Sequence, residues 1–227
     1  RAAAFFRGME MTHRFADLMF TDSVKAAQEH YGSREHNERL QNNFGPNDQL
    51  TSREADFIAF RDTFYLATVG ESGWPYVQHR GGPPGFLRVL GQNLLAYADF
   101  RGNTQLVSVG NLSSDDRCSL ILVDYPNRRR LKILGRMRIE DARTASPDLL
   151  MQVELPGYRA RIERVALIEV AAFDWNCPQH ITQRYTELEF AELWEGDRAT
   201  FLRRGSDDRS SNLRTADHRK PRARRQK

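Results

Sequence analysis

The stretch Phe64-Tyr-Leu-Ala-Thr-Val-Gly-Glu-Ser-Gly-Trp-Pro-Tyr-Val-Gln-His-Arg80 holds two runs of β-branched and aromatic residues around a cluster of turn residues. Such runs favour strands, and a short connection rich in Gly and Ser is typical of a hairpin. We therefore expect strands over 64–69 and 74–80. Strands joined by so few residues must be antiparallel, because a parallel crossover needs about a dozen residues or more.

The same pattern continues along the chain. Further strands are predicted over 86–90, 94–98, 118–125, 131–139 and 165–173, with helices over 22–31, 51–61, 104–112 and 187–202. The helix at 51 is marked by Thr51 and Glu54, which have the spacing of a capping box. A doubly wound parallel sheet is disfavoured, since the chain has no G-x-G-x-x-G or Walker motif. The predicted fold is mainly β with added helices, an antiparallel barrel of six or seven strands.

Composition divides the chain into three parts. Residues 1–49 form a polar arm with a helix and an Asn- and Gly-rich loop, 50–202 form the domain, and 203–227 form a basic tail. The tail has ten Lys or Arg and three Asp, whereas the rest of the chain has 24 basic and 27 acidic residues. We expect the tail to be disordered, because it has too few apolar residues to offset its ordering entropy. Nucleic-acid binding is then confined to weak, non-specific contacts of the tail.

Several classes of protein are disfavoured. The longest apolar runs have about seven residues, against roughly 20 for a membrane-spanning helix. The first eight residues lack the order of a signal peptide, so a cytoplasmic protein is expected, with Met9 and Met11 as alternative starts. Two cysteines, Cys118 and Cys177, are too few for a disulfide scaffold or a structural zinc site, and no metal is predicted.

Four segments place polar residues on strands that otherwise resemble core. In 77–85, Gln78 and Arg80 share one strand face, His79 lies on the other, and Gly81-Gly82 permits close approach of a ligand. The alternative is an exposed strand face followed by a loop. In 99–104, a strand leads into a helix whose N-terminus could bind a phosphate, or the segment is simply an N-cap.

The other two segments lie later in the chain. In 126–132, four cations follow a turn, either as a solvated hairpin tip or with Arg130 oriented towards a phosphate. The segment from Phe173 to Ile181 is dense in aromatic and polar residues. Cys177 as a nucleophile is disfavoured because no acidic partner can be assigned, whereas Trp175 suits the wall of a ligand pocket.

Together these segments resemble the pyridoxamine 5′-phosphate oxidase-like proteins, whose fold is the FMN-binding split barrel. The resemblance extends from Leu50 to Ile181, and is greatest to the branch of predicted flavin-nucleotide-binding proteins. It rests on stretches similar to Pro75-Tyr-Val-Gln-His-Arg-Gly-Gly82, Tyr97-Ala-Asp-Phe-Arg-Gly-Asn103, Arg130-Leu-Lys-Ile-Leu-Gly135 and Trp175-Asn-Cys-Pro-Gln-His-Ile181.

The resemblance implies a homodimer with FMN at the subunit interface. The implied cofactor-binding residues are Gln78, His79, Arg80, Gly81, Gly82, Tyr97, Ala98, Phe100, Gly102, Asn103, Thr104, Arg130, Trp175 and Asn176. The oxidase proper has Ser-Arg-Lys at the phosphate turn, where this chain has Gly102-Asn103-Thr104, and its C-terminal Trp and Arg signature is missing. Oxidation of pyridoxamine phosphate is therefore not implied.

Two functional hypotheses follow from the resemblance. The first is an FMN-dependent oxidoreductase that acts on an unknown small molecule with an unknown electron donor, and no catalytic residue can be named for it. The second is a flavin-binding module that senses or stores redox state without turnover. Relatives of the same barrel are associated with haem or a deazaflavin, which are alternative ligands.

Overall fold

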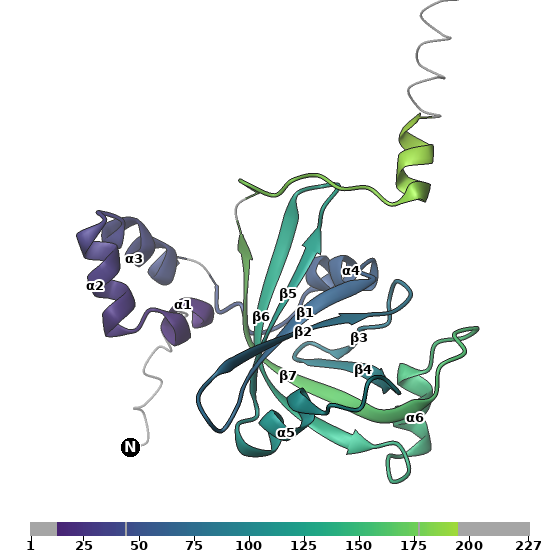
Figure 1. Ribbon diagram of the computed structural model, residues 1–227. Helices are drawn as coiled ribbons and strands as arrows, with labels where there is room; N and C mark the ends of the chain where they lie inside the picture. Colours follow the sequence, from purple (N-terminus) through teal and green to yellow (C-terminus); the bar gives the residue numbers. More distant parts are fainter. Residues whose placement is uncertain (1–12, 44, 177, 195–227) are drawn as a thin grey trace, which may run out of the picture. The chain divides into compact units, whose positions relative to one another are not determined.

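The computed structural model describes residues 13–43, 45–176 and 178–194 and contains a seven-stranded antiparallel sheet (Figure 1). The strand order is β2-β1-β5-β6-β7-β4-β3. The strands are β1 (Thr63–Val69), β2 (Pro75–Gly81), β3 (Arg88–Gly91), β4 (Leu94–Phe100), β5 (Arg117–Asp124), β6 (Arg129–Asp141) and β7 (Ile162–Asn176). The predicted fold class, mainly β with added helices, is confirmed.

Three predicted hairpins are present, and three further strand pairings join them. β1 pairs with β2, β3 with β4 and β5 with β6, each through a short connection. The long strand β7 then lies between β6 and β4, and β1 pairs with β5. These three pairings, β1 with β5, β6 with β7 and β4 with β7, combine the hairpins into one curved sheet.

Helix α4 (Ser52–Ala59) lies at one end of the sheet (Figure 1) and begins with the predicted capping box. The backbone and hydroxyl of Thr51 both donate to the Glu54 carboxylate. This cap fixes the helix so that Phe57 and Ile58 point into the core, where Ile58 is completely buried.

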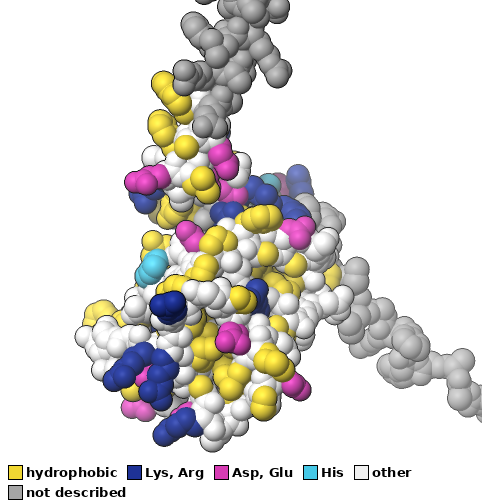
Figure 2. All heavy atoms as spheres, turned by 90° about the vertical axis from the view of Figure 1, so that its right-hand side faces the viewer, with side chains coloured by type: hydrophobic (Ala, Val, Ile, Leu, Met, Phe, Trp, Pro, Cys, Tyr) yellow, Lys and Arg dark blue, Asp and Glu magenta, His cyan; other side chains and the backbone are white. Residues whose placement is uncertain are grey.

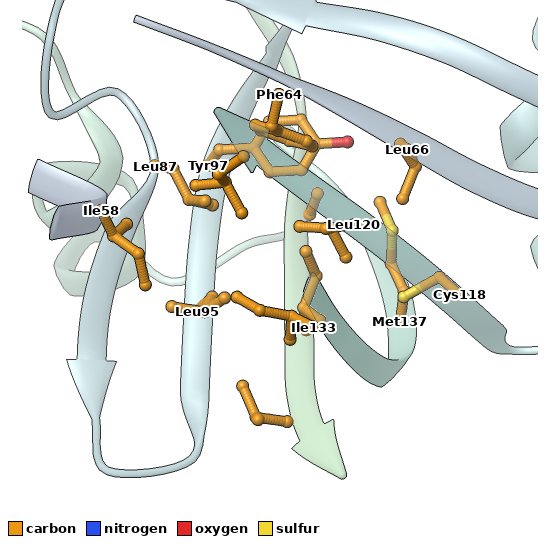
Figure 3. Close-up of a cluster of buried hydrophobic side chains, with 14 of the residues drawn as sticks. Ile58, Phe64, Leu66, Leu87, Leu95, Tyr97, Cys118, Leu120, Ile133 and Met137 are labelled. Atoms are coloured by element: carbon orange, nitrogen blue, oxygen red, sulfur yellow. The ribbon is translucent and has the colours of Figure 1, made fainter. Parts of the chain in front are cut away.

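The main core lies between the two halves of the sheet. Phe64 of β1 and Tyr97 of β4 meet edge to face with ring centroids 5.4 Å apart (Figure 3). Aromatic pairs in this geometry are stabilising beyond their buried area. A second cluster packs Ala96 and Ala98 against Val153 of helix α6 (Pro147–Val153), a helix that the sequence pattern did not predict.

The N-terminal arm has more helix than predicted. The predicted helix is α2 (Asp22–His30). It is preceded in the chain by α1 (Arg14–Met19) and followed by α3 (Arg34–Asn43). The side chain of His13 caps α1, and α1 contacts β7. Helix α3 was missed because it is almost entirely polar and has no apolar period of its own.

The chain divides after Thr182, and the second unit is described only in part. Its described residues form a helix over 187–194, within the predicted helix of 187–202. The remainder of that helix and the predicted tail, 203–227, lie outside the described residues. Within the described ranges, no helix is long and apolar enough to cross a membrane.

Surface charge on the described part of the chain is mixed. On the face shown in Figure 2, Lys and Arg side chains alternate with acidic and hydrophobic ones rather than forming a continuous basic band. This agrees with the slight excess of acidic residues before the tail.

Candidate functional site

A pocket of about 220 Å³ lies where the end of β4 meets β2 and helix α5 (Val107–Ser114). It brings together residues that are up to 88 positions apart, from Tyr76 of β2 to Arg164 of β7. Six of the residues predicted to bind a cofactor line this pocket: Gln78, Arg80, Phe100, Gly102, Asn103 and Thr104.

Strand alternation explains the contribution of β2. Side chains two apart share a face, so Tyr76, Gln78 and Arg80 all line the pocket, while Val77 and His79 point to the other face. The hydroxyl of Tyr76 donates to the amide oxygen of Gln78, which orients that amide. The predicted division of Gln78 and Arg80 from His79 thus agrees with the structure.

A buried carboxylate holds Arg80 in place. Asp99 accepts hydrogen bonds from Arg80 Nη1 at 3.0 Å and from Arg164 Nε at 2.7 Å. The pairing of Asp99 with Arg164 follows from the β4–β7 register, in which the two residues are directly opposite. Arg164 Nη1 also donates to Glu163 at 3.4 Å, so Arg164 is shared between two carboxylates. Among the residues that line the pocket, Arg80 and Arg164 outnumber Asp99, which favours an anionic ligand.

Helix α5 begins later than predicted and has an open N-terminus. The sequence predicts a helix from Thr104, but Thr104 and Leu106 both have left-handed backbone conformations, with φ of 59° and 55°. The helix therefore starts at Val107, and no side chain in the described ranges caps it. Its first backbone N–H groups and the positive end of its dipole are available to an anion.

Two buried polar atoms at this pocket have no hydrogen-bond partner among the described residues. They are Ser108 Oγ and Arg80 Nε. Buried polar groups are normally hydrogen-bonded, and an orphaned group at a pocket suggests a missing ligand or water. With the uncapped helix, these donors fit the phosphate end of a nucleotide.

Trp175 lies elsewhere, at the α4 end of the sheet. Its indole N–H donates to Glu54 at 2.7 Å, and the guanidinium groups of Arg53 and Arg129 lie 4.6 and 4.9 Å from its ring. Burial acts to raise the pKa of Glu54, but the hydrogen bonds from Thr51 and Trp175 outweigh it and lower that pKa. Trp175 follows Arg164 by eleven positions on β7, about 36 Å measured along the strand.

The other predicted residues do not line this pocket. His79 contacts the hydroxyl of Thr63 at 2.6 Å, and Gly82 packs so closely on Phe86 that a Cβ would lie 2.8 Å from it. Tyr97 and Ala98 are buried in the two core clusters. The remaining three are Gly81 on β2, Arg130 on β6 and Asn176 on β7.

Register places several of these residues on the outer sheet face. Leu131 is buried, so its neighbour Arg130 points to the opposite face, beside Val123 of β5 and across from Asn176 in the β6–β7 register. His79 and Tyr65 lie on the same outer face. Of the predicted residues outside the pocket, His79 and Arg130 therefore lie on the outer face of the sheet, whereas Tyr97, Ala98 and Trp175 pack in or against the core.

Sequence reasoning missed eight of the residues that line the pocket, including Tyr76, Asp99, Ser108 and Arg164. Tyr76 and Asp99 lie inside the segments quoted for the resemblance, and Ser108 stands near the helix start, so their positions carried a usable signal. Arg164 carried none, since only the sheet register brings it to Asp99.

Cys177 lies outside the described residues, and the cysteine that the structure describes is Cys118. Burial raises the pKa of the Cys118 thiol to about 12, which keeps it protonated and a poor nucleophile. Within the described ranges, no group of three His, Cys, Asp or Glu side chains could hold a metal ion.

The fold and the pocket together define a small antiparallel barrel with a pocket lined by two arginines beside one helix. A family model described as pyridoxamine 5′-phosphate oxidase matches residues 50–175. This match covers more than half of the chain, and the chain belongs to that family. The predicted resemblance, from Leu50 onward, is confirmed.

Solved structures with related folds include three of low identity. A putative pyridoxamine 5′-phosphate oxidase from Lactobacillus delbrueckii is 20% identical, with 56% of this chain and 94% of that chain covered and a TM-score of 0.44. HupZ from Group A Streptococcus is 15% identical, with 60% and 99% covered and a TM-score of 0.45. An FMN-binding protein from Syntrophomonas wolfei is 8% identical, with 68% and 97% covered and a TM-score of 0.44. No curated protein matches the sequence.

Proposed function

We propose that this protein is a flavoprotein that binds FMN, with the FMN phosphate in the pocket beside α5. The observation that carries the proposal is the set of unpaired donors there: Arg80 Nε, Ser108 Oγ and the uncapped amides of the helix. A phosphate accepts several hydrogen bonds at once, and helix N-termini bind it without a lysine. The phosphate turn of the oxidase proper has two cations, which are absent from Gly102-Asn103-Thr104. In this chain the unpaired donors would bind the phosphate in their place.

The size of the pocket supports a shared site. About 220 Å³ is below the range of about 300–1,000 Å³ that is usual for small-molecule sites. One chain would then enclose the phosphate end of FMN and leave much of the ring uncovered. Arg130 and His79 point to the outer sheet face, and Trp175 is about 36 Å away along β7, so no single chain surrounds one ligand with all of them.

We therefore propose a homodimer in which a second copy completes each site. The outer face of β1 and β2 exposes apolar side chains, with Val77 61%, Tyr65 38% and Val69 37% exposed. Exposed apolar residues that are neighbours on one sheet face are typical of an interface. In such a dimer, Arg130 and His79 of the second copy would contact the ring.

The proposed activity is that of an oxidoreductase acting on a small molecule. Bound FMN would supply a ring that takes up and releases electrons. The chain would contribute orientation: Arg80, held by Asp99, and Gln78, held by Tyr76, have fixed positions in the pocket. Because both oxygens of Asp99 accept from arginines, that carboxylate is committed to structure and is not a free base.

Binding of FMN and riboflavin tests the phosphate assignment. Purified full-length protein should be yellow and release FMN on denaturation. Arg80→Met should weaken FMN binding by about tenfold to a hundredfold, because a charge-assisted hydrogen bond contributes about 1.5–3 kcal/mol, while riboflavin, which lacks the phosphate, should be little affected. Arg138→Met is the matched control, as Arg138 is exposed and outside the pocket.

Three results would contradict parts of this proposal. Colourless protein that takes up no flavin would overturn it. Equal losses of FMN and riboflavin affinity in Arg80→Met would refute the phosphate position. A bound haem or deazaflavin, identified by mass spectrometry, would replace FMN as the ligand.

The dimer is tested separately by sedimentation. Val77→Glu should dissociate it and weaken FMN binding, because a buried carboxylate at the interface would have no partner. Met151→Glu on α6 is a control with similar exposure, 64%, away from the outer face of β1 and β2. A Val77→Glu protein that remains dimeric would contradict this interface.

The same residues would also suit a non-catalytic flavin module. Anaerobic stopped-flow mixing with NADH or NADPH separates the two functions. Rapid reduction of the flavin supports the oxidoreductase, and reduction by dithionite alone supports a redox sensor or store.

A further inference from the structure

A larger cavity, of about 840 Å³, lies between the N-terminal arm and the barrel. Its arm wall comes from α1, α3 and the loop 45–49, and its barrel wall comes from α4, β6 and β7. It shares no residue with the pocket beside α5. The cavity includes Trp175, the aromatic residue that the sequence singled out as a pocket wall and that the proposed flavin pocket leaves unused.

Specific backbone bonds hold the arm in place around this cavity. The N–H of Phe173 donates to the carbonyl oxygen of Asn47 at 2.7 Å, and that of Arg14 donates to Pro46 at 3.0 Å. The Asn47 side-chain amide also lies 2.7 Å from Nε2 of His13, the residue that caps α1. The bond between Phe173 and Asn47 therefore joins the arm to the barrel, and the bonds of Arg14 and His13 join α1 to the loop 45–49 within the arm.

Aromatic rings form much of the cavity lining. Phe15 and Phe20 contribute from the arm, and Phe173 and Trp175 contribute from β7. Phe15 and Phe173 are almost fully buried. The indole of Trp175 is fixed by its bond to Glu54 and by the stacked Arg53. Phe173 belongs to the main core and Lys132 Nζ lies 4.7 Å from the ring of Phe15, so the partly exposed rings on the two walls are Phe20 and Trp175. Two such rings favour a flat ligand, since stacking contributes area at small entropic cost.

The charges at the cavity disfavour an anion. Asp48, Glu54 and Asp174 outnumber Arg53 and Lys132 among its lining residues. Lys132 is already paired with Asp174 at 3.4 Å. A phosphate or carboxylate would meet an excess of negative charge, in contrast to the arginines of the first pocket.

Side-chain amides supply the polar edge. Asn37, Asn47 and Gln49 line the cavity, and each amide has both a donor and an acceptor. The Asn37 amide already donates to the carbonyl oxygen of Ser33 and the Asn47 amide contacts His13, so these two offer only their remaining groups to a ligand. Side-chain amides form hydrogen bonds with the edges of planar rings that carry N–H and C=O groups. We infer that the cavity between arm and barrel binds an uncharged planar heterocycle with hydrogen-bonding groups on its edge, separately from the flavin.

Calorimetric titration of the full-length protein with adenine as a neutral probe tests this site. Adenine should bind with the same affinity to flavin-free and FMN-loaded protein, and benzoate, a planar anion, should bind at least about tenfold more weakly. Leu40→Trp should fill the cavity and weaken adenine binding by about tenfold or more. Val24→Trp, on α2 and outside the cavity, should leave it unchanged.

A second variant keeps the test valid if Leu40→Trp does not fold. Gln49 is exposed and lines the cavity, so Gln49→Leu removes one edge contact without disturbing the core, and it should weaken adenine binding severalfold. The proposal is overturned by absence of adenine binding at millimolar concentration, by benzoate binding as tightly as adenine, or by adenine affinity that neither variant changes.

Discussion

Replacement of Asp99 by asparagine removes the negative charge that holds Arg80 and Arg164, while keeping the shape of the side chain. The Asp99 side chain is only 6% exposed and bonds to Arg80 and Arg164 at 3.0 and 2.7 Å. Asparagine has one acceptor oxygen, so its NH2 group would face the second guanidinium. Loss of one partner from a buried ion pair costs about 3–5 kcal/mol. Because Arg80 and Arg164 remain 23% and 19% exposed, water can solvate them in part, and we expect the lower value.

Urea unfolding followed by circular dichroism measures this change. With an m-value of about 2 kcal/mol/M, a loss of about 3 kcal/mol lowers the midpoint by about 1.5 M and leaves the slope unchanged. Asp141→Asn is the matched control, because Asp141 also binds an arginine, Arg143, through both carboxylate oxygens, but on the surface. It should have no measurable effect, since exposed pairs contribute little. Equal midpoints for the two variants would refute the argument from burial.

Three further predictions concern single side chains. Gly135→Ala should destabilise the protein by about 1–3 kcal/mol in the same urea assay, because the new Cβ would lie 2.8 Å from the carbonyl oxygen of Glu169, which is backbone on β7; wild-type stability would contradict the packing. Burial acts to raise the pKa of Glu54, but its hydrogen bonds outweigh burial and lower that pKa. The ionised Glu54 side chain therefore stabilises the folded protein fully above the ordinary pKa of 4.5, and this stabilisation is lost as pH falls through the lowered pKa. Glu54→Gln should therefore reduce the slope of stability against pH in this acidic range, and an unchanged slope would exclude Glu54 as its source. Cys118, with its pKa raised to about 12, should resist iodoacetamide at pH 8 in native protein and react in urea, as measured by peptide mass spectrometry.

The strands could be predicted because their signal is local. Alternation and turn residues located all seven strands within a few positions, and the capping box at Thr51 located α4. Helix α5 was placed too early because Asn103 and Thr104 have the composition of an N-cap. A cap needs an extended backbone, and Thr104 instead has a left-handed one.

The candidate site could be predicted only in part. Gln78 and Arg80 were assigned correctly to one face because the period of a strand is two. The contact of Arg80 with Asp99 and Arg164 depends on the pairing of β4 with β7, which no short pattern encodes. The composition of the segment around Trp175 suggested the wall of a ligand pocket. The structure places Trp175 at the cavity beside the N-terminal arm and not at the pocket beside α5.

The order of the strands also has a consequence for folding. The β1–β2 hairpin is complete by Gly81, but the other edge of β1 pairs only with β5, whose first residue is Arg117. During synthesis this edge has no partner until about 40 more residues have been made, which takes several seconds at the usual rate. The closing pairs are more distant still, since Leu94 is opposite Glu169. Such non-local pairing is slow, and an unpaired edge is prone to aggregation, so low temperature and slow expression should increase the yield of folded protein.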